Sequence, residues 1–65
     1  MAETLYRQLR KILERHGCTF RRQGKGSHEI WQSPISGKVF SVPTTIKVRP
    51  TANAILRQAG IDEKL

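Results

Sequence analysis

One of the two histidines stands where a glycine-rich turn passes into an expected strand. His28 follows residues 24–27, whose glycines, lysine and serine are typical of a turn. An imidazole titrates near neutral pH and can therefore accept or donate a proton in catalysis. If the substrate is RNA, a base that removes the 2′-hydroxyl proton lets that oxygen attack the adjacent phosphorus, and neither a metal nor a cofactor is required. The alternative is a structural histidine that bonds to a backbone group at the start of the strand.

Cationic residues lie close to His28 in the sequence and suit the same reaction. Negative charge gathers in the transition state, and lysine and arginine stabilise it. We expect Arg22 and Lys25 to hold phosphate, and Lys38 to approach them through the pairing of the strands. The alternative for these cations is a solvated rim that only aids solubility. The alternative for Ser27 is a turn residue without a role in binding. The predicted RNA- or phosphate-binding residues are Arg22, Lys25, Ser27, Gly26, Lys38 and Lys47.

The whole chain carries an excess of positive charge. Its 65 residues include 12 lysines and arginines against 5 acidic residues, a net charge of +7 at pH 7. Most of these cations fall within residues 1–25. Such a charge favours a polyanionic partner, because each neutralised phosphate releases condensed counterions. The composition therefore predicts nucleic-acid binding, with a charge that serves only solubility as the alternative.

The lone cysteine, Cys18, excludes an intrachain disulfide and a metal site built on cysteine pairs. A reducing compartment is consistent with this. No apolar run approaches the length of a membrane span or a signal sequence core. We therefore expect a soluble cytoplasmic protein with no membrane partner and no bound metal.

The segment before the turn predicts an amphipathic helix over residues 3–16. Gly17 is expected just past its end, where a positive φ costs glycine little, with Cys18 against Leu13. His16 occupies the last turn, where a positive charge favours the carbonyl end, so we assign it a capping role ahead of a catalytic one. The residues that share the apolar face are Leu5, Leu9, Ile12 and Leu13.

Three short segments predict strands, at residues 18–23, 28–33 and 38–42. Residues 34–37 form the second turn, and Pro43 ends the third strand because proline cannot donate to a ladder. In the first of these segments Cys18 and Phe20 alternate with polar residues, and in the third Phe40 and Val42 share a face.

The side chains of Ile30 and Trp31 compete for one place in the core. Adjacent strand residues point to opposite faces, so His28 shares the face of Ile30 and opposes Trp31. If Trp31 fills the core, His28 lies on the open face, where catalysis requires it. If Ile30 is buried, Trp31 can stack on a base, and His28 escapes burial only by its terminal position. The sequence leaves both arrangements open.

A second helix is predicted over residues 51–59. Thr51 is the expected N-cap, and Gly60 closes the helix, with Ile61 folded back on Leu56. The apolar stripe consists of Ala52, Ile55, Leu56 and Ala59.

These elements predict one α+β domain over residues 1–65, in the order α-β-β-β-α. Short connections make the three strands an antiparallel sheet, and both amphipathic helices pack on one of its faces. The opposite face stays open to solvent. The shape is similar to that of a double-stranded-RNA-binding domain (dsRBD).

The run 22–31 resembles the signature of the HicA toxin family. That signature has an Arg-Gln pair and a lysine, followed by Gly-Ser-His, an isoleucine and an aromatic residue, and Gly26, Ser27 and His28 match its centre. Gly24 resembles a one-residue insertion. Residues 41–43 and 51–61 are similar to the third strand and the closing helix of the family, so the resemblance spans nearly the whole chain.

This resemblance implies a dsRBD-like ribonuclease that cuts mRNA and arrests translation. It implies that His28 is the catalytic residue and that a HicB-like antitoxin binds and masks the site. We expect a monomeric toxin that enters a larger assembly with the antitoxin. Thr44 and Thr45 stand where many members carry a second histidine. The other proton partner is therefore left to a lysine, an arginine or water.

Two other functions are consistent with the sequence. A non-catalytic RNA-binding module would share the fold and the charge. A protein-interaction domain would use its basic face for an acidic partner, and in a toxin pair this coexists with catalysis.

Overall fold

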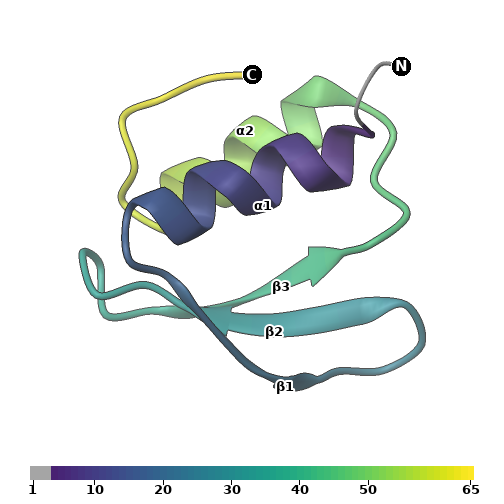
Figure 1. Cartoon of the computed structure of the whole chain (residues 1–65), viewed down its shortest axis with the longest axis horizontal. Helices are drawn as coiled ribbons and strands as arrows, with labels where there is room; N and C mark the ends of the chain where they lie inside the picture. Colours follow the sequence, from purple (N-terminus) through teal and green to yellow (C-terminus); the bar gives the residue numbers. More distant parts are fainter. Residues whose placement is uncertain (1–3) are drawn as a thin grey trace.

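The computed structural model describes residues 4–65 as two helices and a three-stranded sheet. The order is α1 (Leu5–Arg15), β1 (Thr19–Gln23), β2 (His28–Gln32), β3 (Val39–Pro43) and α2 (Arg49–Gln58) (Figure 1). This confirms the predicted α-β-β-β-α arrangement. Glu3, where the first helix was expected to begin, lies outside the described residues.

Local hydrogen bonds stabilise both ends of helix α1. The Thr4 hydroxyl accepts a bond from the Arg7 amide and caps the first turn. At the other end Gly17 has φ +87°, and the Cys18 amide donates to the Leu13 carbonyl at 2.9 Å. This is a Schellman ending, which satisfies carbonyl groups that the helix leaves unpaired. The predicted contact between Cys18 and Leu13 is thus confirmed at the level of the backbone.

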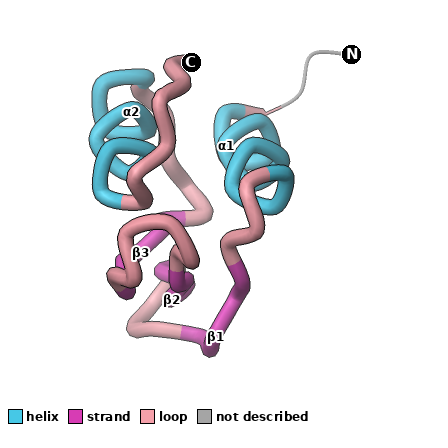
Figure 2. The backbone as a smooth tube through the Cα atoms, turned by 90° about the vertical axis from the view of Figure 1, so that its left-hand side faces the viewer, coloured by secondary structure: helices cyan, strands magenta, loops and turns pink. Residues whose placement is uncertain are grey.

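The sheet is an antiparallel meander in the order β1-β2-β3. Both helices lie on the same side of it, with α2 over β3 and α1 on the side of β1 (Figure 2). The register of β1 shifts between Phe20 and Arg22, which marks a bulge. Phe20 lies before this shift, directly opposite the buried Trp31, and is 49 % exposed because β1 is an edge strand of the sheet. Its ring still contacts Trp31 edge-on, with ring centroids 6.1 Å apart.

The competition between Ile30 and Trp31 is decided in favour of Trp31. Its side chain is 1 % exposed beneath the helices, whereas Ile30 is only half-buried. Phe40, directly opposite Trp31 on β3, is also buried, as predicted. Because neighbouring strand residues alternate, His28 and Ile30 lie on the face that the helices leave open.

Helix α2 begins earlier than predicted. Its N-cap is Val48, without a side-chain cap, and Pro50 stands in the first turn. The expectation that Thr51 caps this helix is therefore wrong. Proline has no N–H to lose at a position where the amide would be unpaired, and its fixed φ suits the first turn, so it does not exclude a helix there.

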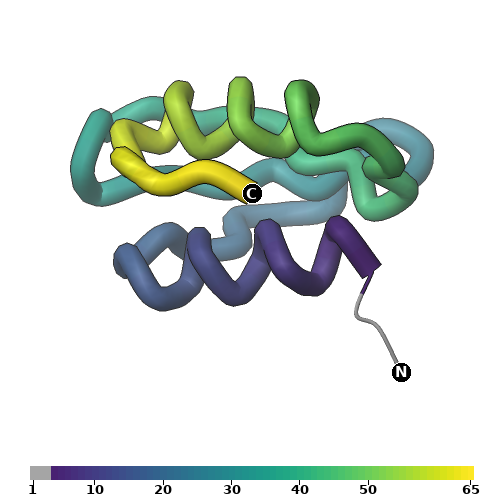
Figure 3. The backbone as a smooth tube through the Cα atoms, turned by 90° about the horizontal axis from the view of Figure 1, so that it is seen from above, coloured from purple at the N-terminus to yellow at the C-terminus, as the bar shows by residue number. Residues whose placement is uncertain are grey.

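The end and the packing of α2 agree with the sequence. Gly60 has φ +77°, and the Ile61 amide donates to the Leu56 carbonyl at 2.9 Å. After that turn, residues 61–65 run back between the two helices on the side away from the sheet (Figure 3). The whole predicted apolar stripe is buried: Ala52, Ile55, Leu56 and Ala59.

Within residues 4–65, neither helix has the length and apolar character needed to cross a membrane.

Candidate active site

The backbone that carries His28 is a tight turn fixed by hydrogen bonds. The His28 amide donates to the Lys25 carbonyl at 3.1 Å and closes the turn. Gly26, the first central residue, has φ +62°, and Ser27 keeps a negative φ. This combination is typical of a type II′ turn, which joins antiparallel strands without splaying them. His28 itself is exposed at the start of β2.

Four further hydrogen bonds hold the turn to its surroundings. The Gly24 amide donates to the His28 carbonyl at 2.8 Å, and the Gln23 side-chain amide donates to the same oxygen at 2.9 Å. Gln23 also donates to the Gly26 carbonyl at 3.2 Å. On the other side of β2, the Thr44 amide donates to the Ser27 carbonyl at 3.0 Å. The start of β2 is therefore anchored to both neighbouring segments.

The open face places His28 in the same layer as one predicted cation. Arg22 pairs with Ile30 across β1 and β2, and directly opposed residues project to the same side of a sheet. Arg22 and His28 thus lie on the same face, on neighbouring strands. Lys25 belongs to the turn itself, which ends two residues later at Ser27.

The remaining predicted cations are divided by the sheet. Lys47 lies in the connection between β3 and α2, which begins beside the turn at the Ser27–Thr44 bond. Lys38 lies at the opposite end of β2, where its carbonyl accepts a bond from the Ser33 amide. The expectation that the meander brings Lys38 close to Arg22 and Lys25 is wrong. The second hairpin turns at the end of β2 far from His28, so it carries Lys38 away from the first turn.

We name the two ends of the molecule for what they carry. The histidine end comprises turn 24–27, loop 44–48 and the N-terminal ends of both helices (Figure 1). The clamp end comprises the C-terminal ends of both helices, the hairpin 33–38 and residues 61–65. The N-termini of both helices lie at this end, on the face of the sheet opposite to His28 (Figure 2).

The carboxylate nearest to His28 in the sequence makes its hydrogen bonds on the face of the sheet that the helices cover. Glu29 accepts hydrogen bonds from the Tyr6 hydroxyl at 2.7 Å and from the Trp31 indole N–H at 3.1 Å. Burial, and then the hydrogen bond and charge of Glu29, raise the pKa of Tyr6 above its ordinary value. Arg10 lies 5.9 Å from the centre of the Trp31 ring. Glu29 therefore ties α1 to the sheet and faces away from the imidazole.

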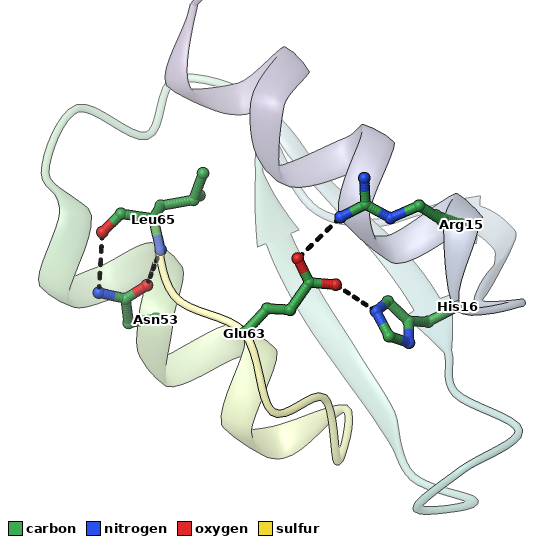
Figure 4. A network of polar contacts seen from close by, with 5 residues as sticks. All are labelled: Arg15, His16, Asn53, Glu63 and Leu65. Carbon is green, nitrogen blue, oxygen red and sulfur yellow. Dashed lines mark hydrogen bonds and ion pairs between the residues drawn. The ribbon is translucent and has the colours of Figure 1, made fainter.

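The second histidine has a different role at the clamp end. Glu63 bonds through one carboxylate oxygen to His16 Nε2 and through the other to Arg15 Nη2, the latter at 2.7 Å (Figure 4). These bonds to His16 and Arg15 lower the pKa of Glu63 below its ordinary value. Nearby, Leu65 bonds to Asn53, its amide reaching the Asn53 side-chain oxygen at 2.7 Å. Residues 61–65 thus clamp α1 to α2, and His16 makes a hydrogen bond to Glu63 that its position at the end of the helix did not by itself predict.

Two features of the site were absent from the sequence predictions. The role of Gln23 in the turn depends on the way its side chain folds back over the following residues. The Tyr6–Glu29 contact joins residues far apart in the chain and breaks the rule that a strand residue facing a core is apolar. A polar residue in phase with Trp31 was the available signal for Glu29.

Comparison with models of protein families matches residues 6–61 to the family described as HicA toxin of bacterial toxin-antitoxin systems. No curated protein and no solved structure matches the chain. The matched span contains both helices' core residues, the entire sheet and the turn that carries His28.

Proposed function

Because the chain belongs to the HicA family of bacterial toxins, we propose that it is a metal-independent endoribonuclease that cuts mRNA with His28 as its catalytic residue. The observation that carries this proposal is the place of His28. Its imidazole is exposed on the open face, which it shares with Arg22, at the turn that also carries Lys25. Family membership supports the toxin role, and the mRNA substrate follows from the resemblance of the Gly-Ser-His turn.

The proposed reaction uses the nucleophile that RNA itself supplies. A base removes the 2′-hydroxyl proton, the 2′-oxygen forms a bond to phosphorus, and the bond from phosphorus to the 5′-oxygen breaks. The products are a 2′,3′-cyclic phosphate and a 5′-hydroxyl end, and the 5′-oxygen takes up a proton. His28 serves as the base or as the acid in this sequence. Arg22 and Lys25 stabilise the negative charge on phosphorus, and Ser27, Gly26 and Lys47 contact neighbouring phosphates.

The second proton partner is not the other histidine. His16 lies at the clamp end in contact with Glu63, and the sheet separates the helix that it caps from the open face (Figure 2). Water or one of the cations around the turn completes the proton transfer. Lys38, at the clamp end of β2, lies outside this proposed site.

The proposed partners follow from the family and the charge. An antitoxin similar to HicB would bind the basic histidine end and mask His28, and opposite charges would steer the association. We propose that the toxin alone is a cytoplasmic monomer and that it forms a larger assembly with its antitoxin.

Replacement of His28 by alanine tests the function. We expect His28→Ala to lower the rate of RNA cleavage about 10²–10⁴-fold, the range that acid–base catalysis contributes. The variant should keep the melting temperature of the wild type, because the side chain is exposed. Cleavage is measured with purified protein and an end-labelled RNA in EDTA, and growth arrest is scored in cells that express each variant.

His16→Ala is the matched control, since it removes the other imidazole and should leave cleavage intact. A folded His28→Ala variant that cuts RNA and arrests growth like the wild type would overturn the proposal. RNA binding without cleavage by the wild type would instead favour a non-catalytic RNA-binding module.

A further inference from the structure

We propose that Gln23 is a positioning residue for the reaction, which holds the turn that presents His28 without touching RNA itself. The expected effect of Gln23 on RNA cleavage rests on the proposed function. Its role in holding the turn does not. The starting point is a side chain that makes two hydrogen bonds to the backbone of the turn. Gln23 Nε2 donates to the Gly26 carbonyl at 3.2 Å and to the His28 carbonyl at 2.9 Å.

Both partners of Gln23 are carbonyl oxygens, so the side chain at position 23 must supply hydrogen-bond donors. The Gln23 side-chain amide can donate to both oxygens because its nitrogen carries two N–H bonds. A carboxylate of the same shape accepts hydrogen bonds only, so it would face the two carbonyl oxygens with like partial charge. A shorter or apolar side chain would leave the Gly26 carbonyl without this donor.

The other bonds described for the turn run between backbone groups, which makes Gln23 its side-chain support. Those backbone bonds fix where β1 and β2 meet and tie Ser27 to Thr44. Gln23 connects the last residue of β1 to the central part of the turn and to the carbonyl of His28. Its two bonds therefore restrain the segment whose movement would displace the imidazole.

At position 24 the two strands of the hairpin approach so closely that a side chain would be crowded. A Cβ at position 24 would lie 3.0 Å from the His28 carbonyl oxygen and 3.2 Å from Ile30 Cδ1. Glycine at this position allows the backbone of β1 to come close to His28. The same closeness brings the Gln23 side chain within reach of two carbonyls of the turn.

Gln23 acts from the face opposite to the imidazole. It pairs with Glu29, whose carboxylate faces α1, so Gln23 projects on the side of the helices. His28, one residue before Glu29, projects to the open face. A nucleotide bound at His28 therefore does not contact Gln23, and the effect of Gln23 on the reaction passes through the backbone.

The test uses two replacements that remove the donors in different ways. Gln23→Glu keeps the shape and adds a charge, and Gln23→Met keeps the length without a charge. We expect both to lower kcat for RNA cleavage about 10–100-fold and to change KM less than about threefold, because a misplaced catalytic group lowers turnover rather than ground-state binding. Gln58→Glu and Gln58→Met make the same changes at the clamp end and should cleave like the wild type.

Two NMR measurements separate positioning from a general loss of stability. Amide hydrogen exchange at His28 should speed up at least about tenfold in both Gln23 variants, while exchange at Trp31, three residues further along β2, stays unchanged. The imidazole resonances of His28 should shift in the same variants. If only Gln23→Glu is impaired, with a raised KM and normal exchange, the cause is the added charge and positioning is refuted.

The outcomes keep this inference distinct from the proposed function. Wild-type kcat together with wild-type exchange at His28 in Gln23→Met would overturn the positioning role. If the wild type itself fails to cut RNA, the proposed function fails, and the exchange and imidazole measurements still decide whether Gln23 holds the turn.

Discussion

The two ends of this molecule use similar residues for opposite purposes. At the clamp end, cations and a histidine contact a carboxylate: Arg15 and His16 share Glu63. At the histidine end, and among the residues that the structure describes, Arg22, Lys25 and Lys47 have no ion pair with any carboxylate. The nearest carboxylate in sequence, Glu29, is directed to the other face by Tyr6 and Trp31.

This difference indicates how a 65-residue chain separates stability from binding. Charges that are paired within the protein contribute to its stability and have less attraction left for a ligand. Unpaired cations repel one another and cost stability, but they attract a polyanion. Among the described residues, Lys38 at the clamp end has no ion pair either, so the contrast lies between the Arg15–His16–Glu63 contact and the cations around the turn.

The largest expected effect in this comparison is the loss of a buried hydroxyl at the clamp end. Ser33 is fully buried, and its Oγ donates to the Ala59 carbonyl at 2.5 Å and accepts from the Ile35 amide at 3.1 Å. Ser33→Ala leaves both groups without this partner, so we expect the free energy of unfolding to fall by about 1–3 kcal/mol. Thermal unfolding followed by circular dichroism measures the change, and RNA cleavage at 25 °C should be unaffected.

Ser41→Ala, at an exposed position of β3, is the control for that loss. Equal stability of the Ser33 and Ser41 variants would contradict the structural role of the buried hydroxyl. Reduced cleavage by a fully folded Ser33→Ala variant would break the separation between the two ends.

A pair of lysine replacements tests the difference in RNA binding. In a His28→Ala background, which prevents cleavage, Lys25→Ala should weaken RNA binding at 0.1 M salt and reduce the slope of log Kd against log salt by about 0.7. That change corresponds to one lost phosphate contact on a single strand. Lys38→Ala removes the same charge from the clamp end and should alter the slope much less. Fluorescence anisotropy over a series of salt concentrations gives both slopes, and equal slopes for the two variants would refute the assignment.

The smallest expected effect concerns Glu63 and depends on pH. Its pKa is lowered in the folded state, chiefly by the hydrogen bonds to His16 and Arg15. A lowered pKa contributes stability above the unfolded pKa, and this contribution is lost as the pH falls through the folded value. Glu63→Gln should therefore melt slightly below the wild type at neutral pH, with the difference shrinking in acid below the ordinary carboxylate range.

Asp62→Asn is the control for Glu63, because it changes the same charge at the preceding position. A melting-temperature difference for Glu63→Gln that stays constant from pH 7 to acid would contradict the ion-pair role. An equal loss in Asp62→Asn would assign the effect to overall charge rather than to the clamp.

The sequence by itself determined the elements and their order. The apolar spacing of both helices and the glycines at positions 17, 26 and 60 act over a few residues, so their consequences were predictable without the fold. The same holds for the turn before His28, and for the charge that favours a polyanion. The predicted start of the second helix at residue 51 is two residues too late, because α2 begins at Arg49 without a side-chain cap to mark its start.

Only the tertiary structure decided which side chains meet. Trp31 took the core place from Ile30 because the larger ring is covered by both helices, and this put His28 on the open face. The second hairpin carried Lys38 away from the turn that holds His28, and the bulge in β1 set Arg22 opposite Ile30. The contacts of Glu63 with α1 join residues nearly fifty positions apart. Such contacts depend on strand register and helix packing, which local spacing does not specify, because each arises only after distant segments have been brought together.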